Sequence, residues 1–299
     1  MAQANPKVSA LTSCYRGEKY LPEFLASCAA QTIVDQVEIV LIHNDPTHGE
    51  LAIVKRFAES HPGLLTHVTT AREPLAISTN RAMSIASGSY RCIWNVDDLR
   101  TSDSLERMAS TLDLNPRAGF TYGDFSVVAE WPSESGVDVA TPPFERREFV
   151  RSMLLGPFYM WRSDVERAIG GWDEQFSVAA DFDFAIRLAL QADGVRTDGM
   201  LGAYLDEGTG LSTSRNGVQE SEGAAILLRY GIYDKVALSR LRAAHSYRVG
   251  AILNSGEWVD LPDVAPDHRR YATSRARLVT SAITPLRLSA RAYVESLRG

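Results

Sequence analysis

The chain has 299 residues, of which 45% are hydrophobic, 23% charged and 9% aromatic, as in an ordinary globular protein. This length suffices for one large domain or two smaller ones. It contains no apolar run of the ~18 residues that a membrane-spanning helix needs, and residues 1–10 lack the apolar segment of a secretory signal. The three cysteines form no CxxC pair, which predicts buried thiols in a reducing cytoplasm rather than a disulfide framework.

The net charge of −6 is unevenly distributed and argues against general nucleic-acid binding. Residues 269–299 hold seven arginines and one acid, a charge of +6. Because the whole chain carries −6, the preceding 268 residues carry −12. A basic tail on an acidic body favours an anionic partner surface.

Residues 1–128 alternate short apolar runs with helix-like segments. The run 37–42 is almost entirely apolar and β-branched, which is typical of a buried parallel strand. Three strand–helix repeats with short connections predict an open, mostly parallel α/β sheet flanked by helices. The predicted strands are 8–11, 37–42, 64–69 and 90–95, and the predicted helices are 18–30, 49–60 and 75–87, the last closed by Gly88.

The pattern changes after residue 128. Pro132, Pro142 and Pro143, among serines and Gly136, indicate a loop or a second subregion. Residues 163–169 and 180–191 are predicted to be helical. Beyond Arg215 the sequence is helix-like and carries no chemical motif.

Polar residues follow each predicted strand, and in an open α/β sheet these strand ends converge on the ligand. Asp97 and Asp98 would repel each other without a cation nearby. Two carboxylates completed by substrate phosphates suit a divalent ion. Alternatively, the pair caps a helix that starts near Ser102.

Several known motifs are absent. The chain has no P-loop, no dinucleotide fingerprint, no HExxH and no zinc-like Cys/His spacing. Only Gly17 follows the first strand, where a nucleotidyltransferase would carry a glycine-rich loop.

A second polar cluster lies at residues 170–174 and 180–188. Asp181 falls at the start of a predicted helix, where the helix dipole favours a negative charge. Asp181 or Asp183 could also be a simple N-terminal cap.

Taken together, these segments resemble the inverting glycosyltransferases of family two, which have the GT-A fold. The resemblance covers residues 6–214. Residues 13–21 resemble T-x-Y-N-x-x-x-Y-L, 42–49 take the place of V-D-D-G-S-T-D-G, 78–82 resemble A-R-N-x-G, 95–98 resemble D-x-D-D, 170–174 resemble G-G-F-D-E, and 180–188 resemble E-D-x-D-L-x-x-R-L.

The resemblance implies roles for individual residues. Asp98, with Asp97, would hold Mn²⁺ or Mg²⁺ on the donor diphosphate, and Asp181 would be the general base. Asp183 and Arg187 would orient the helix that carries the base. The donor nucleotide would be bound by Ser13, by Tyr15 with its ring against the base, by Arg16, by Asn44 at the base or ribose, by Arg72 at the base or a phosphate, by Asn80 and by Asp97.

Three departures from the family pattern stand out. His43 and Asn44 replace the aspartates after the second strand, and Asn95 replaces the first acid of the metal motif. Ala180 replaces the acid that often precedes the base, so like-charge repulsion should raise the pKa of Asp181 less.

The resemblance implies a metal-dependent hexosyltransferase that inverts configuration, with a UDP-sugar favoured as donor and a glycan or lipid-linked hydroxyl as acceptor. The implied setting is bacterial surface polysaccharide or glycolipid synthesis. Residues 1–128 would form the nucleotide-sugar half, 129–215 the acceptor half, and 216–299 a C-terminal helical extension. Two alternatives are a non-catalytic nucleotide-sugar or glycan binder, which the departures favour, and a sugar-phosphate nucleotidyltransferase.

Apolar residues recur at helical spacing among the arginines of 273–297, interrupted by Pro285. This pattern predicts either peripheral contact with the inner face of a membrane or a helix packed on this chain or on another subunit.

Overall fold

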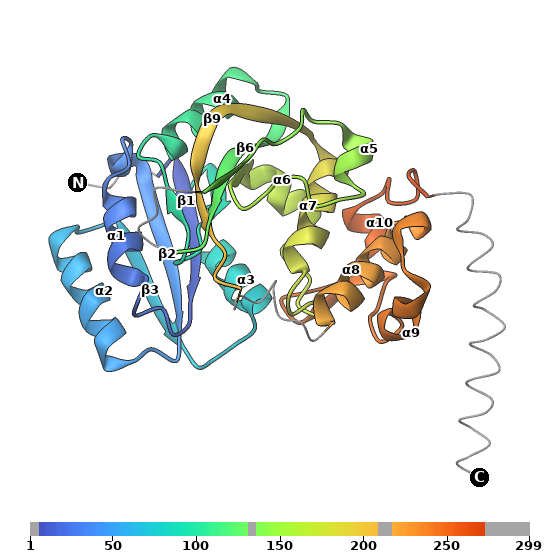
Figure 1. Cartoon of the computed structure of the whole chain (residues 1–299), viewed down its shortest axis with the longest axis horizontal. Helices are drawn as coiled ribbons and strands as arrows, with labels where there is room; N and C mark the ends of the chain where they lie inside the picture. The colour runs from blue at the N-terminus through green and yellow to red at the C-terminus, as the bar shows by residue number, and fades with distance from the viewer. Residues whose placement is uncertain (1–5, 131–135, 209–216, 273–299) are drawn as a thin grey trace, which may run out of the picture.

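A computed structural model describes residues 6–130, 136–208 and 217–272 (Figure 1). Within these ranges one nine-stranded sheet has the order β3-β2-β1-β4-β8-β6-β9-β5, and β7 pairs with β6. Its strands are β1 Val8–Cys14, β2 Val37–Asn44, β3 Leu65–Thr70, β4 Tyr90–Ile93, β5 Leu99–Arg100, β6 Ala118–Val128, β7 Val137–Val139, β8 Tyr159–Arg162 and β9 Asp193–Leu205.

Helices cover both faces of the sheet (Figure 1). Alternate residues of β2 show the two faces: Val40 and Ile42 pack with residues of α3 and α7, whereas Ile39 and Leu41 pack with residues of α1, α2 and α4. The helices are α1 Leu21–Ala29, η1 Val34–Gln36, α2 His48–Ser60, α3 Leu75–Ile85, α4 Ser104–Leu114, α5 Arg146–Phe149, α6 Ser163–Ile169, α7 Ala180–Gln191, α8 Val218–Arg229, η3 Tyr233–Lys235, η4 Leu238–Arg240, α9 Leu241–Ala244 and α10 Leu261–Val264.

The predicted mostly parallel sheet is confirmed. Strands β3, β2, β1 and β4 run parallel, and β6 is parallel to β9. Strand β8 lies antiparallel between β4 and β6. The carboxyl ends of β1, β2, β3 and β4 therefore share one edge, as the sequence predicted.

The sheet extends further than the sequence indicated. Strands β6, β8 and β9 continue it past residue 128, and β7 occupies part of the segment predicted as a loop. One sheet thus runs through both predicted halves, and their division at residue 128 stays a prediction. Pro132, in the same predicted loop, lies outside the described residues.

The described part of the C-terminal extension is helical with one addition. Strands β10 Ala251–Asn254 and β11 Glu257–Asp260 form an antiparallel hairpin that the sequence analysis missed. Its two turn residues, Ser255 (φ 52°) and Gly256 (φ 86°), both have positive φ, which is typical of a type I′ turn. The basic tail at 273–299 lies outside the described residues. No helix of the described part of the chain is long and apolar enough to cross a membrane.

Gly88 has a different role from the helix cap predicted for it. Helix α3 ends at Ile85, and Ala86 is its C-cap. A Cβ atom on Gly88 would lie 2.5 Å from Ser9 Oγ and 2.7 Å from the Ser9 backbone nitrogen. Glycine is therefore required by the close approach of this loop to β1.

We expect Gly88→Ala to lower the free energy of unfolding by about 1–3 kcal/mol, because the added methyl group meets backbone that cannot move freely. Urea denaturation measures this. The control is Gly223→Ala in α8, where a Cβ meets nothing within 4 Å and alanine favours the helix by roughly 0.5–1 kcal/mol. Equal stability of Gly88→Ala and the wild type would contradict the packing argument.

Candidate active site

Asp97 and Asp98 lie in the short segment between β4 and β5, at the edge where the parallel strands end. Asp98 is buried and accepts hydrogen bonds from Asn95 Nδ2 (2.9 Å) and the Leu205 backbone N–H (3.4 Å), whereas Asp97 is half-buried. Burial, and then the charge of Asp97, raises the pKa of Asp98 to about 7. Burial also raises the pKa of Asp97. Two crowded carboxylates that resist ionisation together suit a hard divalent cation.

The alternative that Asp97 and Asp98 cap the next helix is wrong. Strand β5 separates them from α4, and the N-cap position of α4 is Asp103. The acidic pair therefore has no helix-capping function here.

Arginines flank the aromatic side chain after β1. The guanidinium carbon of Arg72 lies 4.5 Å from the Tyr15 ring centroid, and that of Arg16 lies 5.1 Å from it. Tyr15 is half-buried and both arginines are exposed. Because Arg72 follows β3, two strand ends contribute to one cationic, aromatic surface, which suits a base and its phosphates.

Asn44 lies at the end of β2 with its amide fully engaged. Its Nδ2 donates to Ser13 Oγ (3.2 Å) and Ser78 Oγ (3.0 Å), and its Oδ1 accepts from Thr70 Oγ1 (3.2 Å) and the Glu73 backbone N–H (3.0 Å). It is buried. Asn44 therefore holds Ser13 in place, and its own contact with a base stays a prediction.

Asn80 is also committed to the protein. From α3, its Nδ2 donates to the Trp172 carbonyl (2.9 Å) and Glu174 Oε1 (2.8 Å), while its Oδ1 accepts from the Trp172 N–H (2.7 Å). These bonds join α3 to the segment 170–174. The structure thus gives Asn80 a positioning role, and its predicted contact with the donor stays a prediction.

Glu207, just after β9, reaches the loop between β1 and α1. It accepts hydrogen bonds from Lys19 Nζ (2.5 Å) and Tyr20 OH (2.6 Å). In addition to burial, the negative charge of Glu207 raises the pKa of Asp97. The ends of β1, β4 and β9 are thereby brought together at the acidic pair.

Asp181 lies in the first turn of α7 and is half-buried. Its Oδ1 accepts the backbone N–H of Phe182 (2.8 Å). Loss of hydration raises the pKa of Asp181 to about 6, against the opposing effect of that hydrogen bond. The N-cap of α7 is Ala179, so the interpretation of Asp181 as a simple N-cap is wrong. A carboxylate with this pKa is suited to accept a proton near neutral pH.

The side chain of Tyr159 in β8 is buried near the end of β4. Strand β8 runs antiparallel to β4, so Tyr159 follows the pair Cys92–Met160 toward the carboxyl end of β4. The charge of Asp181 acts on Tyr159, and the Tyr159 hydroxyl has no hydrogen-bond partner in the described structure. The sequence analysis did not single out Tyr159, because no motif marks it.

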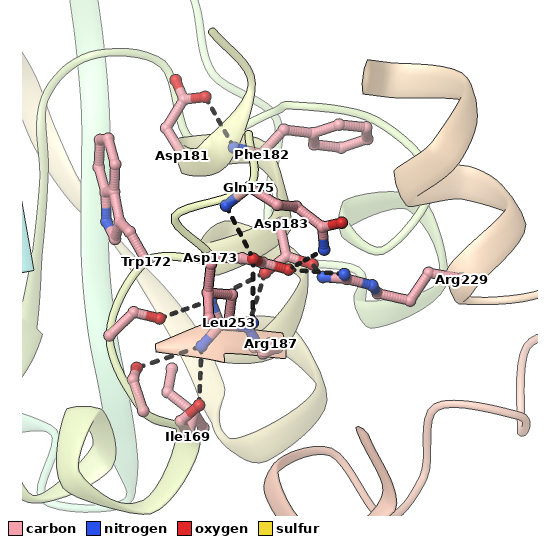
Figure 2. A network of polar contacts seen from close by, with 12 residues as sticks. Ile169, Trp172, Asp173, Gln175, Asp181, Phe182, Asp183, Arg187, Arg229 and Leu253 are labelled. Atoms are coloured by element: carbon pink, nitrogen blue, oxygen red, sulfur yellow. Dashed lines mark hydrogen bonds and ion pairs between the residues drawn. The ribbon is translucent and has the colours of Figure 1, made fainter. Parts of the chain in front are cut away.

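Asp183, two residues after Asp181, belongs to a buried ionic network (Figure 2). It binds Arg187 Nε (2.9 Å), Arg229 Nη1 (2.6 Å) and Tyr230 OH (2.8 Å). Arg229 Nη2 also binds Asp173 Oδ2 (2.6 Å). Burial raises the pKa of Asp183, but the charges of Arg229 and Arg187 outweigh burial and hold it below its usual range.

Glu222 of α8 binds the segment that leads into α7. Its two oxygens accept the backbone N–H groups of Ser177 (2.7 Å), Val178 (2.8 Å) and Ala179 (2.8 Å). Helix α8 thus contributes both Glu222 and Arg229 to the support of Asp181. No sequence motif marks either residue, because their partners lie 43–56 residues away along the chain.

This arrangement joins an acidic pair at the sheet edge to a separate carboxylate of raised pKa. The model of the family "Glycosyl transferase family 2" matches residues 9–159, just over half of the 299 residues. The chain belongs to glycosyltransferase family 2.

Solved glycosyltransferase structures share the fold. Residues 1–349 of Staphylococcus aureus TarS, in complex with UDP-GlcNAc, superpose with a TM-score of 0.60 and 19% identity, covering 79% of this chain and 69% of that one. The mannosyltransferase PcManGT of Pyrobaculum calidifontis, in complex with GDP-Man and Mn²⁺, gives a TM-score of 0.53 and 18% identity over 95% of this chain and 81% of that one. The predicted GT-A fold is confirmed.

The curated relatives match only part of this chain and differ from it in length. An uncharacterized glycosyltransferase of Methanocaldococcus jannaschii is 24% identical over 61% of this chain and 64% of its own. The chondroitin synthase of Escherichia coli is 22% identical over 62% of this chain and 26% of its own. This family 2 chain covers between 20% and 64% of the length of the curated relatives that it matches.

We expect Arg229→Met to lower the free energy of unfolding by about 3–5 kcal/mol, because two buried carboxylates lose their partner. The low pKa of Asp183 contributes stability above the pKa of an unfolded aspartate, and this is lost as the pH falls through the folded pKa. Without Arg229 the folded pKa rises, so acid unfolding should begin at a higher pH.

Urea denaturation and acid titration of the circular dichroism signal measure both effects. Arg270→Met is the control, because Arg270 and Asp267 form an exposed pair at 3.8 Å that contributes roughly 0–1 kcal/mol. Equal unfolding free energies and equal acid-unfolding pH values for Arg229→Met and Arg270→Met would contradict the stabilising role of the network.

Proposed function

We propose that this family 2 glycosyltransferase transfers a sugar from a nucleoside diphosphate sugar, with UDP favoured as the nucleotide, to an acceptor hydroxyl with inversion. The observation that carries the proposal is Asp181, a half-buried carboxylate whose pKa is raised to about 6 on a rigidly held helix.

In the proposed reaction the acceptor hydroxyl gives its proton to a carboxylate oxygen of Asp181. The hydroxyl oxygen then forms a bond to the anomeric carbon from the face opposite the diphosphate. The bond between that carbon and the diphosphate oxygen breaks, and its electron pair leaves with the nucleoside diphosphate. A positioned base typically contributes about 10²–10⁴-fold in rate.

The donor is assigned to the surface after β1 and β3. The Tyr15 ring stacks on the base, Ser13 bonds it, and Arg16 and Arg72 supply positive charge for base or phosphates. UDP-GlcNAc bound to TarS and GDP-Man bound to PcManGT support a nucleotide sugar as ligand class.

A divalent cation, Mn²⁺ or Mg²⁺, fits the acidic pair, because the oxygen donors of Asp97 and Asp98 suit a hard ion and burial raises the pKa of both carboxyls. Such a cation supplies Lewis-acid stabilisation of the leaving diphosphate. Asp97, the more exposed of the two, is assigned as the ligand that faces the donor, and Asp98 supports it from within the protein.

The biological setting follows from similarity alone. Bacterial surface polysaccharide or glycolipid synthesis is in keeping with the likeness to a chondroitin synthase. Peripheral membrane contact through the basic tail stays a prediction, and the tail lies outside the described residues.

We expect Asp181→Asn to lower kcat by about 10²–10⁴-fold and to leave donor affinity unchanged, because the amide cannot accept the proton. In the wild type kcat/KM should fall below pH ~6, where the base is protonated. Steady-state kinetics across pH, with calorimetric titration of the donor, measure both. Asp198→Asn, an exposed acid on β9, is the matched control. Wild-type turnover by Asp181→Asn would exclude Asp181 as the base.

Nucleotide titrations test the acidic pair. We expect one of UDP, GDP and dTDP to bind tightly only with Mn²⁺. In Asp97→Asn, Mn²⁺ should no longer strengthen the binding of that nucleotide. Asp98→Asn, which keeps its shape but loses its charge behind the ligand, should weaken binding by roughly 10–100-fold. Absence of binding by every nucleotide, with or without Mn²⁺, would favour the non-catalytic glycan binder instead.

A further inference from the structure

A second cluster of potential metal ligands lies inside the protein, apart from the acidic pair. It consists of Cys14 at the end of β1, His43 in β2 and Glu50 in α2, all fully buried. One ligand atom of each lies within 4.8 Å of the other two. Cys14 and His43 are direct partners in the β1–β2 register, which explains how residues 29 positions apart meet. Their sequence spacing therefore carries no zinc-like signature.

The buried imidazole nitrogen Nε2 of His43 indicates that this cluster binds a ligand. This nitrogen is buried without a hydrogen-bond partner and lies 3.6 Å from Glu50 Oε2, too far for a hydrogen bond. Leaving such a buried polar group unsatisfied is destabilising. The Nδ1 of His43 lies 3.1 Å from His67 Nε2, and such a contact on the second ring nitrogen orients metal-binding histidines.

The carboxylate and the thiol are also held in place. Glu50 accepts the backbone N–H groups of Gly17 (2.6 Å) and Thr47 (2.7 Å), one on each oxygen, which leaves further lone pairs on both. A Cβ atom on Gly17 would lie 2.5 Å from Cys14 Sγ. Glycine at this position therefore leaves the sulfur its space beside the carboxylate.

We propose that Cys14, His43 and Glu50 bind a zinc ion that joins β1, β2 and α2. A thiolate, an imidazole and a carboxylate are the donors that zinc takes, whereas Mg²⁺ prefers oxygen alone. With metal–ligand bonds of about 2.0 Å, a tetrahedral site separates N and O by roughly 3.3 Å, close to the 3.6 Å observed. A water molecule or the second oxygen of Glu50 completes the coordination, and the thiol releases its proton to solvent on binding.

The site has a structural consequence for the donor surface. Cys14 directly precedes Tyr15 and Arg16, so a metal bound behind them fixes the end of β1 against α2. This inference does not depend on the proposed reaction, because zinc content is measured without turnover.

The test is the metal content of the full-length protein, purified without chelator and measured by elemental analysis. We expect about one zinc per chain in the wild type and in Cys92→Ala, a buried free cysteine of β4 outside the cluster, and a loss of at least tenfold in Cys14→Ala. Asp97→Asn should retain zinc, which separates this site from the acidic pair. Zinc lost equally from Cys92→Ala and Cys14→Ala would overturn the proposal.

Cobalt substitution provides a second, spectroscopic readout. Wild-type protein stripped by chelator and titrated with Co²⁺ should develop a thiolate-to-cobalt charge-transfer band at one equivalent, with a rise in thermal stability. His43→Asn should remove the band. A wild-type protein that contains no zinc and shows no such band has no metal site at Cys14, and the proposal fails.

Discussion

The buried ionic network around α7 is the interaction on which the rest of the active site depends. Two aspartates, Asp173 and Asp183, face two arginines, Arg187 and Arg229, so the interior charge is balanced. Arg187 also donates to the carbonyls of residues 169–171, which ties the end of α6 to α7. Because each buried charge needs its partner, the segment 170–174, α7 and α8 have one favourable arrangement.

This arrangement gives two acids of one helix opposite properties. Asp183 accepts hydrogen bonds from Arg187, Arg229 and Tyr230 and stays ionised, whereas Asp181 accepts the backbone N–H of Phe182 and loses hydration by burial. Their pKa values move in opposite directions for these reasons. Titratable groups whose environments separate their pKa values commonly divide structural and proton-transfer roles. Figure 2 shows Asp181 outside the network and Asp183 within it.

The sequence predicted what depends on local pattern. Strands and helices up to residue 93 were recognised because buried parallel strands are continuous apolar runs and their helices are amphipathic. Strand β6 was missed, since Gly119, Gly123 and Asp124 interrupt its apolar pattern. Motif order singled out Asp97, Asp98 and Asp181 as candidates. It could not locate Glu222 and Arg229, whose roles arise only from long-range packing of α8 against α7.

The residues that depart from the family pattern make hydrogen bonds that explain their presence. Asn95, in place of an acid, donates to Asp98, and Asn44 both donates and accepts within a cluster of strand ends, which an aspartate cannot do. Position 180 carries no acid, but the charge of Glu222 adds to the raised pKa of Asp181 after the larger effect of burial. A carboxylate from a distant part of the chain thus contributes to the electrostatic environment of Asp181 although the local motif has changed.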